Sequence, residues 1–374
     1  MPSYLFLLVL GALGAAGGGG SSSGASTGRV AGNDDDGSST PPVAPMEDAP
    51  EPAPVSPMVV SLAPASDAPD LPASAYDIGW PGLSAEEQLM VELVNRARLD
   101  PEGELERQDE GFAAGVTTEP KEALAVVPSL SDAADAHSQD MDDRDFFSHT
   151  NPDGESPADR AVEAGHGSGY VGENIGWIGS TSTSFDEQAR VESHHDNLWD
   201  SDGHQQNFMS DNWNEIGVGY DYGSYRGYDG STFATEMFGD RGETYLTGVV
   251  IDDQDGDDFY DIGEGVGGVQ ITAYRGEEAY GTATWDAGGY TLALPPGDYR
   301  VVFEGGGLDA AYETGVTIGD ENVKLDIIDD GGAVAASLSA GSVPDPALIP
   351  TVDETSNDPL IAMAEADEDT MVIF

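Results

Sequence analysis

The spacing of apolar residues predicts three helices in the first part of the chain that looks packed. In GLSAEEQLMVELVNRARLDP, apolar residues recur at helical spacing. Ser84 and Glu87 have the spacing of a capping box, and Pro101 is a stop signal, so a helix is expected between them. The same periodicity predicts further helices from Leu130 to about Phe146 and from Phe185 to Trp199.

After these helices, the apolar residues alternate or run together in short stretches bounded by glycine. EIGVGYDYG and STFATEMFG predict two strands. Helices followed by strands indicate an α+β domain. Beyond Glu243, the segments YLTGVVI, GVQITAY, GTATWDAGGYTLALPPGDYRVVFEG and VKLDI are β-type and are separated by Gly, Pro and Asp. This pattern is typical of a small all-β sandwich.

Both ends of the chain lack the periodicity of packed elements. The apolar run within residues 1–16 is too short to span a bilayer and fits the core of a signal peptide. Residues 17–81, rich in Gly, Ser, Pro and Asp, predict a disordered linker. Residues 331–374 form an acidic tail without a membrane span. The α+β domain therefore covers 82–242 and the β-sandwich 243–330.

The charge of the chain narrows the classes of partner. It has 71 acidic and 13 basic residues among 374, a formal net charge of -58, and its lysines are Lys121 and Lys324. Such a surface repels phosphate backbones and anionic lipid headgroups, which argues against nucleic acid and acidic membranes and favours cations. It also suits salty water, where screening weakens self-repulsion. The absence of cysteine excludes disulfides, zinc-thiolate sites and thiol nucleophiles, but it does not exclude export.

The histidines cluster in the α+β domain, between positions 137 and 204. His137 aligns with apolar neighbours on one helix face, which predicts a buried structural residue. His149 precedes the turn sequence TNPDG and His204 follows DSDG, so both are expected on loops or helix ends. Glu173 lies between them in GYVGENIGW. A carboxylate beside two imidazoles can bind a divalent metal, or it can orient one imidazole as a proton acceptor.

Four motifs in order, FFSHTNPDGESP, GEN, GHQQNFM and IGVG, strongly resemble the bacterial form of the CAP superfamily, also called the SCP/PR-1-like family, over roughly residues 84–241. The resemblance implies an α-β-α sandwich with a central cleft. It places His149, Glu173 and His204 in that cleft, where several members bind a divalent cation. The chain could thus hold a transition metal such as Zn²⁺.

The wider family often adds a second glutamate to this set. Glu187 and Glu192 both compete for the position. Glu192 would share a helix face with His195 at i and i+3, although a solvated charged face explains that spacing equally well. Glu192 is therefore a weaker candidate ligand than the two histidines and Glu173.

A second constellation, DDQDGDDFYDIGEG, begins the β-sandwich. Counted from Asp253, its oxygen donors fall at positions one, three, five, seven, nine and twelve of a loop, with position seven offering a backbone carbonyl: Asp253, Asp255, Asp257, Phe259, Asp261 and Glu264. Ca²⁺ requires six to eight such oxygens. Position six is Asp258 where glycine is usual, and aspartate tolerates the left-handed backbone that this position needs. The alternative is an acidic turn in an acidic protein.

The segment 244–328 also resembles the SdrD B-like or Cna B-like modules of bacterial surface proteins, whose loops hold calcium. The resemblance implies that the module is a stalk or spacer, stiffened here by calcium.

Three functions follow as hypotheses. The first is a secreted or cell-surface CAP protein, not an enzyme, that binds a small ligand, a lipid or an extracellular polymer through its cleft. The second is an extracellular metal-dependent hydrolase, since a metal held by two His and one Glu can activate water. The third is a surface or matrix adhesion protein, which several β modules in series would favour and the single module does not.

No Ser, His and Asp triad is evident, because Ser148 and His149 are neighbours and point to opposite sides of extended backbone. Oligomeric state stays open.

Overall fold

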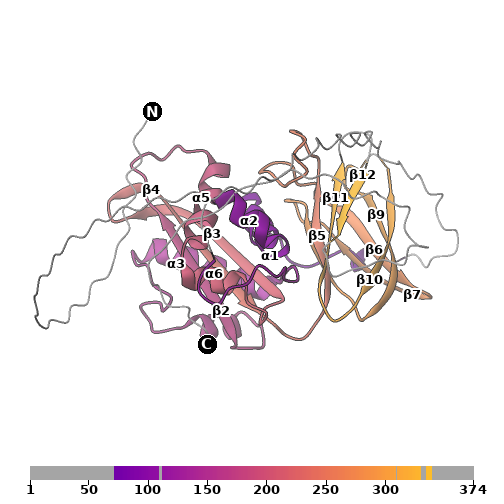
Figure 1. Ribbon diagram of the computed structural model, residues 1–374, viewed down its shortest axis with the longest axis horizontal. Coiled ribbons are helices and arrows are strands. Elements are labelled where there is room, and N and C mark those ends of the chain that lie inside the picture. Colours follow the sequence, from indigo (N-terminus) through magenta and orange to yellow (C-terminus); the bar gives the residue numbers. More distant parts are fainter. Residues whose placement is uncertain (1–70, 109–111, 309, 330–333, 339–374) are drawn as a thin grey trace, which may run out of the picture. The chain divides into compact units, whose positions relative to one another are not determined.

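A computed structural model describes residues 71–108, 112–308, 310–329 and 334–338 (Figure 1). The predicted signal peptide, the linker up to residue 70 and the tail from residue 339 lie outside these ranges. The described residues belong to one compact unit, residues 57–374. Among them, none of the helices has the length and apolar character needed to cross a membrane.

The first predicted helix is confirmed together with its cap. Helix α1 (Ala85–Leu99) begins after Ser84, whose hydroxyl accepts a hydrogen bond from the Glu87 N–H while the Glu87 carboxylate accepts one from the Ser84 N–H. Pro101 does not simply end the helical region, as the sequence suggested. It opens α2 (Pro101–Gln108), because the first position of a helix does not require an N–H donor.

The remaining helices are α3 (Pro128–Asp143), α4 (Pro157–Glu163), α5 (Glu187–Trp199) and α6 (Asp202–Phe208). Helices α3 and α5 correspond to the second and third predictions. Helix α3 ends three residues before the predicted Phe146, since Asp145 adopts a positive φ of 55° that no α-helix allows. The short helices α4 and α6 were not predicted, because each has only seven residues.

Four strands form the sheet of the α+β domain in the order β1-β3-β4-β2. They are β1 (Ala125–Val126), β2 (Val171–Ile178), β3 (Glu215–Tyr225) and β4 (Tyr228–Gly239). Strands β3 and β4 match the prediction. Strand β2 was missed because its sequence, VGENIGWI, has no regular alternation of apolar and polar residues.

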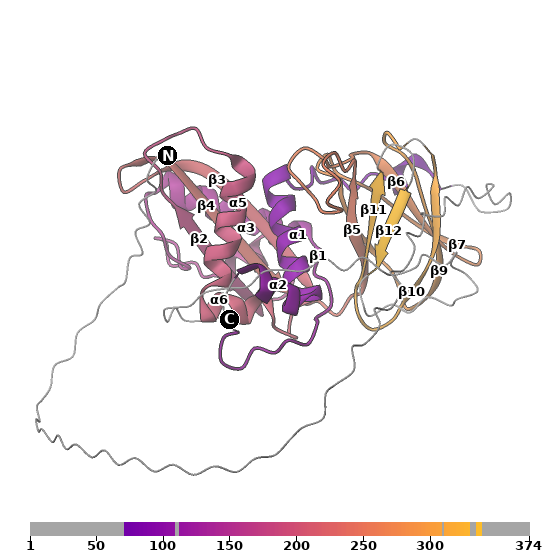
Figure 2. The same cartoon turned by 45° about the horizontal axis from the view of Figure 1, so that its top comes forward.

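Helices cover both faces of this sheet, which gives the three layers of an α-β-α sandwich (Figure 2). Helix α3 packs on one face, while α1, α5 and α6 pack on the other. The motif IGVG explains how closely α3 approaches: a Cβ atom on Gly217 or Gly219 would lie 2.1 or 2.2 Å from its backbone. Only glycine fits at these two positions of β3.

The β module consists of two four-stranded sheets, as the predicted sandwich requires. One has the order β10-β9-β6-β7 and the other β12-β11-β5-β8, with β11 parallel to β5. The strands are β5 (Tyr245–Ile251), β6 (Val269–Arg275), β7 (Glu278–Ala283), β8 (Gly289–Ala293), β9 (Gly297–Gly305), β10 (Tyr312–Ile318), β11 (Val323–Asp329) and β12 (Val334–Leu338). Buried apolar side chains of β5, β6, β8, β9, β10 and β11 form a single core cluster.

Helix α1 and the β module share a buried junction. Trp285 Nε1 donates to Oε1 of Gln88 at 2.9 Å, and Nζ of Lys324 lies 2.7 Å from Oε2 of Glu92. Lys324 and Glu92 are both buried, and the apolar residues around them belong to one core cluster that includes strands of both domains. Asn322 adds hydrogen bonds to the backbone of the α+β domain at Ala123 and Asn214 and to the Glu122 carboxylate.

Two expected boundaries shift because of packing. Residues 71–81, assigned to the linker, include a 3-10 helix (Ala73–Ala75) and Tyr76, whose hydroxyl hydrogen-bonds to Thr272 of β6. Residues 334–338, assigned to the tail, form β12 and pair with β11. The first segment packs against the β module through Tyr76, and the second adds an edge strand to one of its sheets.

Candidate functional site

The GEN motif lies on β2, and two adjacent residues of it serve opposite faces of the sheet. Glu173 is paired in register with Met237 of β4, and Asn174 with Glu236. Because successive side chains of a strand alternate, Glu173 reaches the α3 and α4 side while Asn174 reaches the α6 side. Both side chains are buried.

Gly172, the first residue of the GEN motif, occupies a position with little room for a side chain. A Cβ atom on Gly172 would lie 3.0 Å from Oδ1 of Asn207 and 3.0 Å from the ring of Trp213. Asn207 in turn donates from Nδ2 to Oδ1 of Asn174 at 2.9 Å and to the carbonyl of Glu173 at 3.3 Å. Strand β2 and helix α6 are thus held together at this point of the sheet.

His149 and Arg160 both bind the Glu173 carboxylate. Nδ1 of His149 lies 2.9 Å from Oε1, and a guanidinium nitrogen of Arg160 lies 2.6 Å from Oε2. Burial alone would raise the pKa of Glu173, but the hydrogen bond from His149 and the charge of Arg160 lower it. Glu173 is therefore a carboxylate whose two oxygens are already occupied.

The sequence after His149 places Arg160. Asn151 Oδ1 accepts hydrogen bonds from the N–H groups of Asp153 and Glu155, which closes the NPDG turn. Ser156 then caps α4 with a reciprocal pair of hydrogen bonds to Asp159, and Pro157 occupies the first helical turn. Arg160 lies one turn into that helix, where it also donates to the carbonyl of His149 at 3.0 Å.

His204 lies on α6, with its main chain held by β2. Its carbonyl accepts a hydrogen bond from Nδ2 of Asn174 at 3.4 Å. Burial, and then the charge of His149, lower the pKa of His204 to about 4, so its imidazole is neutral at pH 7. Its Nδ1 is buried and has no hydrogen-bond partner among the described residues.

These features fit a divalent metal bound through imidazole. Nδ1 of His149 faces the Glu173 carboxylate, so Nε2 is the ring nitrogen directed away from it, which is the arrangement of many metal-ligating histidines. His204 offers a neutral imidazole. Within the described ranges, however, His149, Glu173 and His204 do not bring their ligand atoms within 4.8 Å of one another. The residues present therefore offer two imidazoles as candidate ligands, with Glu173 hydrogen-bonded to His149.

The other histidines have structural surroundings. His137 is buried, as predicted, and burial lowers its pKa to about 4. His194 contacts the Thr232 hydroxyl at 2.8 Å, and His195 lies 3.0 Å from the buried carboxylate of Glu104. His166 is also buried, with Nε2 3.7 Å from a carboxylate oxygen of Glu215.

Glu192, the weaker candidate ligand, forms no cluster of metal-ligating atoms with His149 and His204 among the described residues. Its side chain is exposed on α5 and accepts a hydrogen bond from Gln188 at 3.2 Å. Burial raises its pKa, and Asp196 and Asp261 raise it further. The structure therefore places Glu192 beside the acidic loop of the β module. Glu187, at the start of the same helix, is exposed as well.

Glu236 is a buried acidic group that the sequence reasoning missed. It is fully buried on β4, where Oε2 accepts a hydrogen bond from Asn174 at 3.1 Å and Oε1 has no partner among the described residues. Burial raises its pKa to about 8. A signal was present in the sequence, since ATEMF puts one acidic residue inside an otherwise apolar strand.

The acidic loop of the β module gathers three of its predicted ligands. Carboxylate oxygens of Asp253, Asp255 and Asp257 lie within 4.8 Å of one another. Asp258, at position six, has a φ of 62°, the left-handed conformation that the sequence required there. Oε1 of Glu264 accepts a hydrogen bond from the N–H of Gln254 at 2.8 Å.

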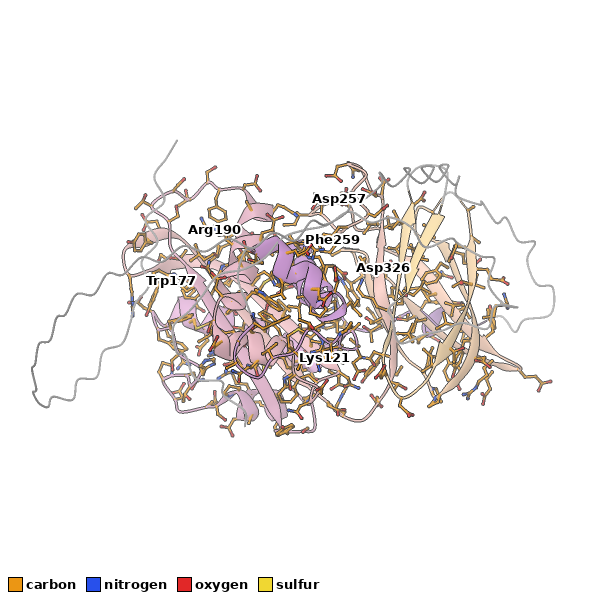
Figure 3. The ribbon with its side chains drawn as sticks, in the orientation of Figure 1. Lys121, Trp177, Arg190, Asp257, Phe259 and Asp326 are labelled. Carbon is orange, nitrogen blue, oxygen red and sulfur yellow. The ribbon has the colours of Figure 1, made fainter. Side chains whose placement is uncertain are left out.

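The loop also contacts the α+β domain. The side chain of Gln188 on α5 donates to Oδ1 of Asp261 at 2.5 Å and accepts from the N–H of Ile262 at 3.0 Å. The guanidinium of Arg96 lies 4.9 Å from the ring centroid of Phe259. Figure 3 labels Asp257 and Phe259 in this loop and Asp326 in the β module.

Comparison with known proteins shows which family the α+β domain resembles. Residues 91–238 match the model of the cysteine-rich secretory protein family, CAP. The uncharacterized protein YkwD of Bacillus subtilis (strain 168) is 32% identical over 139 residues, which is 37% of this chain and 43% of that protein. Residues 91–238 are thus similar to a CAP domain, and the α+β domain is called the CAP domain from here on. It spans less than half the length of that relative.

Solved structures similar to the CAP domain include two bacterial proteins. One is an extracellular protein with an SCP domain from Bacillus anthracis, 23% identical, with a TM-score of 0.28 over 41% of this chain and 39% of that one. The other is an outer surface protein of Borrelia burgdorferi, 13% identical, with a TM-score of 0.29 over 42% of this chain and 92% of that one.

The β module matches a different family from the one that its sequence suggested. Residues 246–328 match the model of the carboxypeptidase regulatory-like domain. This finding replaces the specific assignment to SdrD B-like or Cna B-like modules. The predicted β-sandwich is confirmed by the two sheets, and only the family that it resembles differs.

Proposed function

We propose that this protein is an exported CAP-domain protein that binds an extracellular ligand at a site formed by His149, Glu173 and His204. A divalent transition metal such as Zn²⁺ is held there by the imidazoles of His149 and His204. The contact between Nδ1 of His149 and Oε1 of Glu173 supports this proposal most directly, because it commits the other ring nitrogen to a ligand. When bound, the metal supplies a Lewis-acidic centre for an oxygen or nitrogen of the ligand.

Binding is a better account of the site than hydrolysis. A metal-dependent hydrolase needs a group that takes a proton from the attacking water. Glu173 is the carboxylate of the proposed site, but both of its oxygens are engaged by His149 and Arg160. Glu192, the other candidate, lies beside the acidic loop. The proposed role is therefore a binding module, with hydrolysis as the alternative.

The acidic loop contributes a second ion to the proposal. Asp253, Asp255 and Asp257 supply a compact set of carboxylate oxygens, with the carbonyl of Phe259 and the side chains of Asp261 and Glu264 completing the predicted set. Calcium prefers such oxygen ligands in flexible geometry. Bound there, it would stiffen the β module where Gln188 of the CAP domain contacts it.

Metal analysis of the purified full chain tests this function. The protein is dialysed against equal concentrations of Zn²⁺ and Ca²⁺, then freed of unbound ions, and compared with the double variant His149→Ala/His204→Ala. The proposal expects one zinc in the native protein, none in the variant, and the same calcium content in both. Equal zinc content in the native protein and the double variant would rule out the proposed metal site. Zinc-dependent cleavage of an ester or peptide probe, lost in the double variant, would favour the hydrolase.

A further inference from the structure

His137 contacts the peptide that carries His149. It lies on α3 with its side chain buried, and its Nε2 is 3.1 Å from the carbonyl oxygen of Ser148. A carbonyl only accepts, so Nε2 carries the proton of a neutral imidazole. The ring also packs against Phe146, with centroids 5.9 Å apart. One side chain thus holds the loop at the residue just before His149.

A second side chain holds the same loop at the next carbonyl. Arg160 of α4 donates to the carbonyl oxygen of His149 at 3.0 Å. Two consecutive carbonyls, those of Ser148 and His149, are therefore fixed by side chains from two different helices. Because Arg160 also binds Glu173, it sets the direction in which the His149 ring must point.

The loop would be poorly fixed without these two contacts. Phe147 and Ser148 are exposed, and Ser148 Oγ accepts only a local hydrogen bond from the N–H of Thr150 among its described contacts. Arg160 acts on the carbonyl that follows the Cα of His149, and His137 on the carbonyl that precedes it. Holding both sides restricts rotation about the backbone of His149 more than either contact does alone.

We infer that His137 is a positioning residue for His149, whose hydrogen bond to the Ser148 carbonyl keeps the His149 ring aligned with Glu173. The role rests on the proposed metal site, but its geometry exists without the metal. Among the described residues, His137 forms no hydrogen bond with Glu173, although the two side chains interact electrostatically. Its hydrogen bond reaches His149 through the backbone of Ser148.

Two variants separate this role from general stability. His137→Gln retains a side-chain N–H that can reach the Ser148 carbonyl, whereas His137→Leu retains the volume and loses the donor. His194→Leu is the matched control, because His194 is equally buried and bonds to Thr232 on the face of the sheet that α5 covers. Any loss of affinity that follows from removing a buried histidine should appear in this control as well.

The first readout is zinc affinity, measured on the full chain by competition with a chromophoric chelator. We expect His137→Leu to weaken zinc binding by about tenfold to a hundredfold, the range for residues that orient a metal ligand. His137→Gln should stay within about threefold of the native protein, a difference of under 1 kcal/mol. His194→Leu should lower the melting temperature without changing zinc affinity.

The second readout needs no metal. Ring ¹⁵N signals of His149 in the metal-free protein report which nitrogen carries the proton. The native protein and His137→Gln should show the proton on Nδ1, and His137→Leu should show a mixture of the two tautomers. Unchanged His149 signals in His137→Leu would overturn the inference, as would equal losses of zinc affinity in His137→Leu and His194→Leu. If the native protein binds no zinc but the tautomers still differ, the proposed function fails and the positioning role stands.

Discussion

Nζ of Lys324, on β11, lies 2.7 Å from Oε2 of Glu92, on α1, and both side chains are buried. One is in the β module and the other in the CAP domain. Desolvation of a buried ion pair costs nearly as much as its attraction gains, so the pair stabilises little by itself. Losing one partner is different, because it leaves the other charge buried and uncompensated.

Lys324→Met should therefore lower the free energy of unfolding by about 3 kcal/mol, and the double variant Lys324→Met/Glu92→Met should recover much of that loss. Urea denaturation of the full chain measures both. Lys121→Met is the control, since its partner Asp211 is exposed and such pairs contribute under about 1 kcal/mol. Equal effects of the two lysine variants would show that the junction is not buried in solution.

Because the CAP domain and the β module share one core cluster, we expect them to unfold together. Calorimetry of the full chain should show one transition whose calorimetric and van't Hoff enthalpies agree. Lys324→Met should shift that whole transition to lower temperature. Two separate transitions in the native protein would contradict a continuous core.

Glu236 should make the protein less stable as the pH rises. Its pKa is about 8 in the folded protein, against 4.5 for an ordinary glutamate. Between these two pH values the folded state keeps a proton that the unfolded chain releases. The contribution of Glu236 to the free energy of unfolding is therefore full below pH 4.5 and is lost as the pH rises through 8. The loss approaches about 1.4 kcal/mol per pH unit within this window.

Glu236→Gln should remove this pH dependence, and the variant should exceed the native protein in stability at pH 8. The control is Glu104→Gln. Although burial opposes it, hydrogen bonding to His195 and the charge of Arg96 hold the pKa of Glu104 well below its usual range. Glu104 thus stabilises above pH 4.5, and its replacement should lower stability at pH 7. Urea denaturation measures the free energy of unfolding of both proteins against pH. Parallel profiles for the native protein and Glu236→Gln would rule out a raised pKa for Glu236.

The glycine of the GEN motif makes a steric prediction. Gly172→Ala places a Cβ 3.0 Å from Asn207 and Trp213, so it should cost about 1–3 kcal/mol, as overpacking does. Gly169→Ala is the control two residues before β2, because its Cβ would meet neighbours at 3.7 Å, an ordinary contact. Thermal melts of both variants decide the matter, and a neutral Gly172→Ala would show that α6 is not held against β2 as described.

Calcium should raise the melting temperature of the full chain, since an ion that binds only the folded loop stabilises it by about 2.7 kcal/mol at a hundred times its dissociation constant. Asp255→Asn should abolish most of this shift. Asp286→Asn, at an exposed position of the same module, should retain it. Identical melts of the native protein with Ca²⁺ and with a chelator would leave the acidic loop without its proposed ion.

The sequence predicted those parts of the structure that depend on local patterns. The Ser84 cap, the strands on either side of Arg226 and the left-handed backbone at Asp258 each follow from a few neighbouring residues. His149 and His204 were selected because each adjoins turn residues, and Glu173 because it lies between them in GYVGENIGW. The motif resemblance then predicted that the three share one cleft. The structure then brought His149 to Glu173, which lies 24 positions further along the chain.

What the sequence could not predict depends on contacts between distant segments. Arg160 was not selected, because nothing in its neighbourhood shows that α4 points it at Glu173. Glu192 was considered because the family resemblance suggests a second glutamate on this helix, yet its charged neighbours in the structure are Asp196 and Asp261. The junction at Lys324 was invisible for the same reason, since its partner lies on the first helix.

The proposed function requires that His149 and His204 hold one metal ion and that Glu173 orients His149. Calorimetric titration of the full chain with Zn²⁺, in excess Ca²⁺ to fill the acidic loop, tests this claim directly. We predict one site, lost in His149→Ala and in His204→Ala, and weakened about tenfold to a hundredfold in Glu173→Gln. Equal zinc affinity in all four proteins would contradict it.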